Sequence, residues 1–297
     1  MRRLYFVHLT AGLALAASAG AAQQWVVTRT KADIDAEIKG TQVSVALERP
    51  SIVAGEPLVL SVTIANETDA ERMVCTDRSC LAWTIRSPSG IAVSAWTTAP
   101  HGDMAGPAAL LAPHASTSFS VVAPDTAGIA APGSYQVEAQ YMDVGWAGHL
   151  GAAAEPRSFT VLPRNEAALA KRVRELSEAA MFPAAPSADV LAFQALAVIR
   201  HPVPESVLCD AINRNVLAAQ YLVPRLEASG DAEAVGCLVD QLGKGGLNAT
   251  VIIAALGRMT RTQADPTLRQ RIEEGIAGAC ARATPDMPWM KGACSKP

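Results

Sequence analysis

The sequence predicts a multi-domain β + α protein: an antiparallel β-sandwich over residues 41–163, then a domain of α-helical hairpin repeats over residues 164–284. Two periodicities predict this order. Apolar and polar residues alternate in the first part, as in half-buried strands, whereas apolar residues recur every third or fourth position in the second, as in amphipathic helices. With 297 residues, of which 50% are hydrophobic, the chain is long enough for two ordinary cores.

The N-terminal residues 1–22 have the pattern of a secretory signal peptide. Arg2 and Arg3 precede the apolar run Leu4–Ala17, and small residues then offer a cleavage site just before Gln23. The run is shorter than the roughly 20 apolar residues that span a bilayer. We therefore expect a bacterial Sec-type exported protein, periplasmic or secreted, without stable membrane insertion after cleavage. Residues 23–40 are expected to form a lead segment with a charged, weakly helical stretch.

About seven short strands are expected in the β-sandwich. In the clearest one Leu58, Leu60, Val62 and Ile64 alternate with polar residues, and a turn follows at residues 66–69. The other strands are expected at residues 43–47, 82–86, 91–96, 117–122, 134–141 and 158–162. Short strands between turns rich in Pro, Gly and Asn are typical of antiparallel sandwiches.

These strands carry motifs that resemble an immunoglobulin-like domain. The motifs are Leu58-x-Leu-x-Val-x-Ile-x-Asn66-x-Thr68, Pro88-x-Gly90-x-x-Val93-x-x-Trp96, Leu111-x-Pro113 and Pro132-Gly133-x-Tyr135-x-Val137. They look most similar to the type named after a bacterial intracellular proteinase inhibitor, over roughly residues 41–163. The resemblance implies an Ig-like β-sandwich and raises protease inhibition as an alternative function, although one such sandwich serves many unrelated functions.

The helical domain is expected to begin with a helix at Glu166–Met181, capped by Asn165. Its apolar face is expected to be buried. Its charged face is expected to be solvated and comprises Lys171, Arg172, Arg174, Glu175 and Glu178.

Three helical hairpins are expected to follow, at residues 190–213, 216–242 and 250–283. In the second, Gly230 suits the left-handed turn that ends a helix, and Asp231 can cap the next helix. A hairpin of about 30 residues cannot bury its own apolar face, so neighbours are expected to stack. The pattern resembles degenerate HEAT-like repeats over roughly residues 187–284. An irregular helical bundle is the alternative.

The chain contains six cysteines, an even number that suits disulfides in an exported protein. Sequence position groups them into three pairs, although six cysteines allow 15 pairings and some thiols could be free and buried. Cys209 and Cys237 fall on the second helices of adjacent hairpins, and Cys280 with Cys294 would tie the tail, residues 285–297, to the last helix. Cys75 and Cys80 flank a short loop with Asp77 and Arg78 at its tip.

Loops of the β-domain supply the other candidate contacts. The segments 100–113 and 142–155 are long for connections, and long loops are often functional. The second contains Trp146 and His149. A loop tryptophan can anchor a partner because it offers a large contact area, or it can fold back onto the sandwich.

No catalytic motif is present: G-x-S-x-G, H-E-x-x-H, Walker A and G-x-G-x-x-G are all missing from the sequence. We therefore expect no enzyme, no catalytic residue, no metal and no cofactor. The polar cluster that an unrecognised enzyme or metal site would use lies on β-domain loops and comprises His101, Asp103, His114, Asp143 and His149.

The composition and repeats favour a protein partner. A formal net charge of −3 offers no basic field for nucleic acid or an anionic membrane. Stacked hairpins make an extended surface suited to proteins. We expect a periplasmic, non-catalytic protein-binding or scaffold protein. The alternatives are an exported hydrolase inhibitor, acting on a protease or neutralising a toxin, and an enzyme with an unrecognised His/Asp site.

Overall fold

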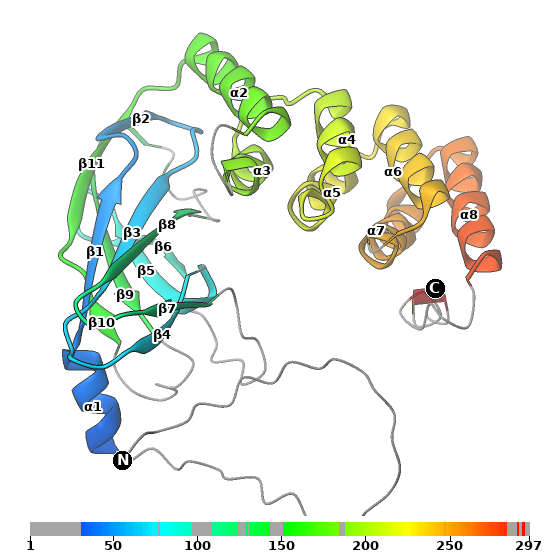
Figure 1. Cartoon of the computed structure of the whole chain (residues 1–297). Helices are drawn as coiled ribbons and strands as arrows, with labels where there is room; N and C mark the ends of the chain where they lie inside the picture. The colour runs from blue at the N-terminus through cyan, green and yellow to red at the C-terminus, as the bar shows by residue number, and fades with distance from the viewer. Residues whose placement is uncertain are drawn as a thin grey trace, which may run out of the picture.

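A computed structural model describes residues 31–76, 78–96, 108–123, 129, 131–142, 151–183, 188–246, 248–283, 290 and 293–294. The predicted signal peptide, residues 1–22, lies outside this part of the chain. Helix α1 (Lys31–Lys39) comes first, then a β region of strands β1–β11 and a helical region of helices α2–α8 (Figure 1). The mixed β + α class expected from the sequence is confirmed.

The β region contains three sheets. The first has the order β1 (Thr41–Leu47), β3 (Val59–Asn66), β8 (Ser116–Val122). The second has the order β2 (Ser51–Val53), β11 (Arg157–Leu162), β9 (Gly133–Tyr141), β5 (Leu81–Arg86), β6 (Ala92–Trp96), with β10 (Ala152–Ala153) also paired to β9. Strands β4 (Arg72–Cys75) and β7 (Ala108–Leu111) form the third sheet.

One apolar core joins these sheets. The alternation of strand β3 buries Leu60, Val62 and Ile64, which are at most 1% exposed. Side chains from β5, β9 and β11 pack in the same cluster, including Ile85, Tyr141 and Phe159. Alternating side chains therefore bury one face of each sheet, as their period of two predicts.

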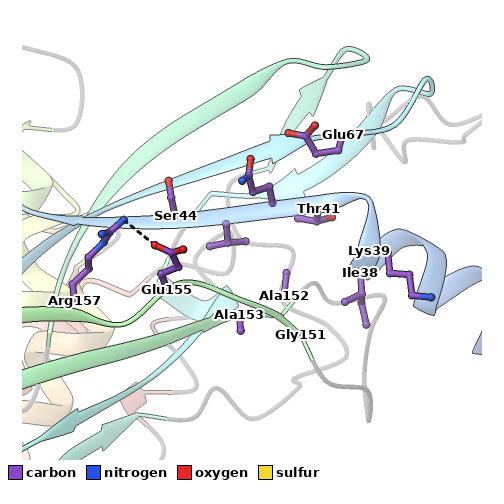
Figure 2. Close-up of a pocket in the computed structure, with 12 residues that line it drawn as sticks. Ile38, Lys39, Thr41, Ser44, Glu67, Gly151, Ala152, Ala153, Glu155 and Arg157 are labelled. Atoms are coloured by element: carbon purple, nitrogen blue, oxygen red, sulfur yellow. Dashed lines mark ion pairs between the residues drawn. The ribbon is translucent and has the colours of Figure 1, made fainter.

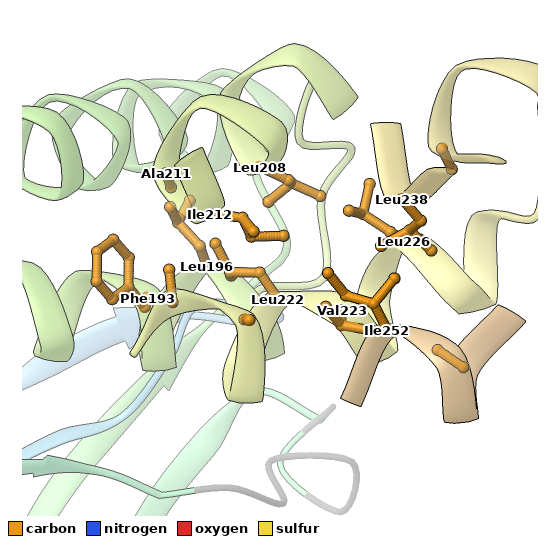
Figure 3. Close-up of a cluster of buried hydrophobic side chains, with 14 of the residues drawn as sticks. Phe193, Leu196, Leu208, Ala211, Ile212, Leu222, Val223, Leu226, Leu238 and Ile252 are labelled. Carbon is orange, nitrogen blue, oxygen red and sulfur yellow. The ribbon is translucent and has the colours of Figure 1, made fainter. Parts of the chain in front are cut away.

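The helical region consists of α2 (Glu166–Met181), α3 (Ala188–Val198), α4 (Glu205–Arg214), α5 (Ala218–Ser229), α6 (Ala232–Lys244), α7 (Ala249–Thr262) and α8 (Pro266–Ala281). Helices α2, α4, α6 and α8 form one row, and α3, α5 and α7 form a second row beside it (Figure 1). Apolar side chains from both rows meet between them, among them Phe193, Leu222 and Leu238 (Figure 3). Each helix thus buries its apolar stripe against its neighbours.

Local sequence signals predicted several helix ends correctly. The Asn165 side chain accepts a hydrogen bond from the Ala168 N–H at 3.0 Å, and α2 has the predicted bounds. Gly230 has a φ of 65°, and the Asp231 side chain accepts from the Ala234 N–H at 2.8 Å. The predicted cap of α2 and the predicted α5–α6 turn are confirmed.

Four strands were not expected from the sequence. Strand β2 lies in the connection between the first two expected strands, β4 follows the turn at residues 66–69, and β7 and β10 lie within segments expected to be long loops. They are two to four residues long. The partners of β2, β4 and β7 are distant in sequence, since β2 pairs with β11 and β4 with β7, whereas β10 pairs with the preceding strand β9. Such short runs carry little periodicity of their own.

The helical region packs directly on the β region. Val59 and Val122 belong to the helical core although they lie on β3 and β8. The Val122 N–H donates to Gln194 Oε1 at 3.3 Å, and the Arg200 N–H donates to the Gly55 carbonyl at 2.8 Å. A Cβ at Gly55, whose φ is 98°, would approach Arg164 Nη1 to 2.9 Å, so glycine permits this close contact. We call this contact surface between the two regions the joint.

Candidate functional site

The joint contains an ion network of two arginines and three glutamates. Arg172 Nη2 donates to the two carboxylate oxygens of Glu48 at 2.9 and 2.8 Å. Its Nε lies 3.7 Å from Glu56 Oε1. Arg49 donates to Glu56 and to Glu175, both at 3.1 Å. Helix α2 is thereby tied to the β1–β2 connection and to the Glu56 turn.

Arg172 corrects the expectation that the charged face of α2 is solvated. Arg172 is 9% exposed and Glu56 is 6% exposed, so both are buried in the joint. Helical periodicity shows only which side of α2 is polar. It cannot show that the β region covers part of that side.

The short disulfide loop of the β region also reaches the joint. The Arg78 guanidinium lies over the Tyr221 ring of α5, 5.5 Å from its centroid. The Tyr221 hydroxyl in turn accepts a hydrogen bond from Gln194 Nε2 at 3.3 Å. Arg78, predicted to lie at the tip of this loop, makes a cation–π contact between the two regions in the structure.

A shallow groove lies between the α3–α4 connection and α5. Its volume is about 890 Å³. We call it the helical groove. Its exposed lining includes Pro202, Pro204, Pro224 and Ala228, and Tyr221 lines it as well. Exposed Arg200 and Ser229 also line the groove, so its surface combines rigid apolar residues with polar ones.

Arg225 builds the wall of the helical groove. Its Nη1 donates to the carbonyls of Leu196 and Ile199 at 2.6 and 2.8 Å, and its Nη2 donates to the His201 carbonyl at 2.5 Å. Burial lowers the pKa of the Arg225 guanidinium, and the nearby Glu205 carboxylate opposes that shift. These bonds satisfy carbonyls at the end of α3, so Arg225 stabilises the groove's shape.

A second hollow lies at the edge of the β region. Its volume is about 790 Å³, and β1 and the segment around β10 form its two walls (Figure 2). We call it the edge slot. The β1 wall includes Thr41, Val43 and Ser44, and the opposite wall includes Ala152 and Ala153. The charged side chains of Lys39, Glu67, Glu155 and Arg157 complete the lining, so the slot is mainly polar.

The structure forms all three disulfides that the sequence suggested. Cys75 bonds Cys80, Cys209 bonds Cys237, and Cys280 bonds Cys294, with Cα–Cα distances of 6.2, 5.9 and 5.7 Å. The second bond links α4 to α6, adjacent helices of one row. The three disulfides indicate an oxidising compartment outside the cytoplasm. Within the described part of the chain, no helix is long and apolar enough to cross a membrane.

The other predicted contact residues lie outside the described part of the chain. These are Asp77, Trp146 and His149, together with three members of the His/Asp cluster, His101, Asp103 and Asp143. His149 belongs to this cluster too, and its fifth member, His114, is exposed, with its Nε2 3.0 Å from Asp69 Oδ1. No group of three or more potential ligands among the described His, Cys, Asp and Glu residues is placed to hold a metal ion.

Sequence reasoning missed both hollows and the joint. The joint residues Glu48, Arg49 and Glu56 precede Arg172 by more than a hundred positions, and no local pattern links them. One signal was available for the edge slot: the regular alternation of residues 43–47 marks a strand, although not its position at the edge of a sheet.

Comparisons with known proteins give no family. No family model matches the chain, and no curated protein matches it. A β-glucosidase mutant of Listeria innocua, solved with laminaribiose, is 11% identical over 42% of this chain, with a TM-score of 0.25. The chain spans 16% of that protein's length.

Two other solved structures are similarly distant. An alkylpurine DNA glycosylase of Pseudomonas fluorescens, bound to DNA, is 14% identical over 42% of this chain and 31% of its own, with a TM-score of 0.24. The CARDB domain of a Pyrococcus furiosus protein is 12% identical over 42% of this chain and 94% of its own, with a TM-score of 0.22. Similarity at this level identifies neither a family nor a function for the chain.

Proposed function

We propose that this chain is an exported, non-catalytic protein-binding scaffold of the periplasm or the extracellular space. In this proposal the β region is an Ig-like sandwich of residues 41–163, and the helical region is a HEAT-like repeat domain of residues 164–284. The signal-like N-terminus and the three disulfides support export.

The joint is the observation that carries the proposal. Buried Arg172 and Glu56, the shared apolar cluster and the Arg78–Tyr221 contact hold the helical groove in a fixed relation to the β region. A surface fixed before binding has less conformational freedom to lose when a partner docks. The mixed lining of the groove, with exposed prolines and Tyr221 beside polar residues such as Arg200 and Ser229, suits a polypeptide partner.

The hydrolase-inhibitor alternative gains no support from the described residues. An inhibitor needs a loop that projects into the target's active site. Asp77 and Arg78 were the candidate tip residues, of which the structure describes Arg78. Its guanidinium instead lies over Tyr221 of the same chain. We therefore retain the scaffold as the proposed function.

The experiment uses the mature chain as bait in periplasmic extract of the producing bacterium. The captured partner is then purified and titrated by calorimetry against wild type and two variants. Ala228→Arg places a long charged side chain in the helical groove, whereas Ala281→Arg does so at an exposed position of α8, outside the groove. We expect Ala228→Arg to weaken binding at least tenfold, or about 1.4 kcal/mol, and Ala281→Arg to leave it unchanged.

Two results would contradict the proposal. One is the absence of any stoichiometric partner, together with turnover of a small molecule by the purified chain. The other is a partner whose affinity is the same for wild type and Ala228→Arg. The second result would leave a binding function but remove the helical groove as its site.

A further inference from the structure

In the described part of the helical region, the large exposed apolar side chains all lie on one side. They are Phe182, Val216, Leu217 and Val251, with exposed fractions of 70%, 47%, 47% and 38%. Phe182 follows the last residue of α2, Val216 and Leu217 connect α4 to α5, and Val251 lies in the first turn of α7. We call these four residues the apolar tips.

Two contacts show that the first of these connections lie next to each other. The Arg214 guanidinium, at the end of α4, lies over the Phe182 ring, 5.7 Å from its centroid. Asn215 Nδ2 donates to Asp189 Oδ2 at 2.6 Å and ties the α4–α5 connection to the start of α3. The ends of α2 and α4 therefore share one side with the starts of α3 and α5.

Helix α7 starts on the same side. Arg258 of α7 donates to the Glu227 carboxylate of α5 at 2.6 and 2.7 Å. Five residues further along α7, Gln263 Nε2 donates to the Gly230 carbonyl at the end of α5, at 2.8 Å. The two helices thus run in the same direction as neighbours of the second row (Figure 1), so their first turns lie side by side.

Basic residues accompany the apolar tips. Arg214, Lys244 and Arg282 are exposed and lie at the ends of α4, α6 and α8. Lys244 Nζ donates to Asn213 Oδ1, which places the end of α6 beside the end of α4. Helices of the two rows alternate along the chain (Figure 1), so α8 also ends on this side.

Acidic residues are nearly missing from this side. The described residues that form it are 181–183, 188–190, 213–220, 243–246, 248–251 and 281–283. Among them Asp189 is the only acidic residue, and it already accepts hydrogen bonds from Asn215 and from the Val190 N–H. Three positive charges and one negative charge give +2 on this side, whereas the whole chain has −3. The total charge therefore conceals a side that is basic and apolar.

The shape of this side favours a flat lipid surface over a peptide. None of the apolar tips lines the helical groove or the edge slot. They occupy helix ends and connections, from which exposed side chains project. Peptides are normally held in a groove or along a strand edge. Projecting apolar side chains among basic ones instead suit the boundary between lipid chains and anionic head groups.

We propose that the apolar tips dock the mature chain reversibly on an anionic lipid surface. The tips enter the boundary of the acyl chains, while Arg214, Lys244 and Arg282 meet lipid phosphates. The contact is peripheral and uses no spanning segment. The helical groove lies near the opposite helix ends and stays free for a partner, so loss of the groove function would leave this inference standing.

The test is flotation of the mature chain with vesicles of equal parts phosphatidylglycerol and phosphatidylcholine, and with vesicles of phosphatidylcholine alone. Phe182→Ser combined with Leu217→Ser removes apolar tips. Its matched control combines Ile91→Ser with Leu110→Ser, at residues that are 67% and 60% exposed on the β region. Thermal unfolding of each variant checks that it folds.

A second pair of variants tests the charges. Arg214→Gln combined with Lys244→Gln removes two positive charges beside the tips. Arg174→Gln combined with Arg261→Gln removes two exposed positive charges elsewhere on the helical region and is the matched control. Ala228→Arg, which obstructs the helical groove, is included so that failure of the groove and failure of the lipid contact can be told apart.

We expect binding to the vesicles that contain phosphatidylglycerol and at least tenfold weaker binding to phosphatidylcholine alone. Both tip-side variants should lower the partition coefficient at least tenfold, with no effect from the two controls or from Ala228→Arg. The proposal is overturned if the chain stays unbound, or if either tip-side variant binds like its control. A protein partner that is lost with Phe182→Ser, without any vesicle binding, would overturn it in favour of a polypeptide on this side.

Discussion

At the scale of single residues, Arg172 has a structural role that its position in the sequence does not reveal. It lies among the charged residues of α2, yet it is 9% exposed and donates to Glu48 at 2.8 and 2.9 Å. A buried charge is tolerated when its partners are close, but removal of one member leaves the others buried without compensation. Arg172 therefore stabilises both the fold and the orientation of the two regions.

Arg172→Met is expected to destabilise the chain by about 3 kcal/mol, because the buried Glu56 and the neighbouring Glu48 lose their shared cation. Urea unfolding at neutral pH measures the loss. Arg174→Met is the matched control, since Arg174 is exposed on the same helix, and we expect a change within about 0.5 kcal/mol. Equal losses in the two variants would show that the joint does not depend on the Arg172 charge.

Asp231 acts at the residue scale through a single cap. Its Oδ1 accepts from the Ala234 N–H at 2.8 Å at the start of α6. Asp231→Ala is expected to cost about 1 kcal/mol, and Asp231→Asn much less, because the amide oxygen can still accept that bond. Thermal unfolding of the three proteins checks the order. An Asn variant as unstable as the Ala variant would indicate that charge, rather than the cap bond, matters here.

At the scale of elements, local signals and distant contacts differ in what the sequence can predict. The bounds of α2, the Asn165 cap and the Gly230–Asp231 turn follow from residues a few positions apart, and each was predicted. Strands β4 and β7 exist because Val74 and Ala109 pair across a long connection. Neither strand has enough residues to show a period, so the pairing could not be inferred.

The candidate sites likewise depend on contacts between residues that are distant in the sequence. The wall of the helical groove depends on Arg225 of α5 meeting the carbonyls of Leu196 and Ile199 at the end of α3. The edge slot depends on β1 and β10 lying side by side although more than a hundred residues separate them. The cysteines were an exception, because only residues that meet in space can form a disulfide. For Cys209 and Cys237, the expected positions on the second helices of adjacent hairpins predicted that α4 and α6 meet.

The Cys209–Cys237 disulfide is expected to stabilise the helical row that contains α4 and α6. The two cysteines are 28 residues apart, and a cross-link of this size destabilises the unfolded chain by roughly 3.6 kcal/mol through lost conformational entropy. Replacing both cysteines with serine should lower the melting temperature under non-reducing conditions. The same change at Cys280 and Cys294, which are 14 residues apart, should lower it less. A reversed order would show that α4 and α6 are held mainly by packing.

At the scale of the whole molecule, the joint makes the relation between the two regions sensitive to acid. Burial raises the pKa of the Glu175 carboxyl, but hydrogen bonds from Arg49 and Arg172 outweigh it and lower the pKa below its ordinary value of 4.5. Because the folded-state pKa is lowered, the ionised carboxylate adds stability above the unfolded-state pKa. That stability is lost as the pH falls through the folded-state value.

The free energy of unfolding is therefore expected to differ between wild type and Glu175→Gln at neutral pH. This difference should shrink as the pH falls below about 4.5, where the wild-type carboxyl becomes neutral in the unfolded and then the folded chain. Urea titrations of both proteins at several pH values measure it. A difference of equal size at about pH 7 and about pH 3 would contradict a role for the Glu175 charge.

The two helical rows are linked in different ways, and this has a mechanical consequence. A covalent bond joins α4 to α6 in one row, whereas α5 and α7 in the other row are joined across their surfaces by the reversible Arg258–Glu227 ion pair. When the stack bends, the disulfide keeps α4 and α6 at a fixed separation, whereas the ion pair between α5 and α7 can break and allow these helices to move apart. Bending between these two pairs of helices is therefore expected to change the spacing of α5 and α7 more readily than that of α4 and α6.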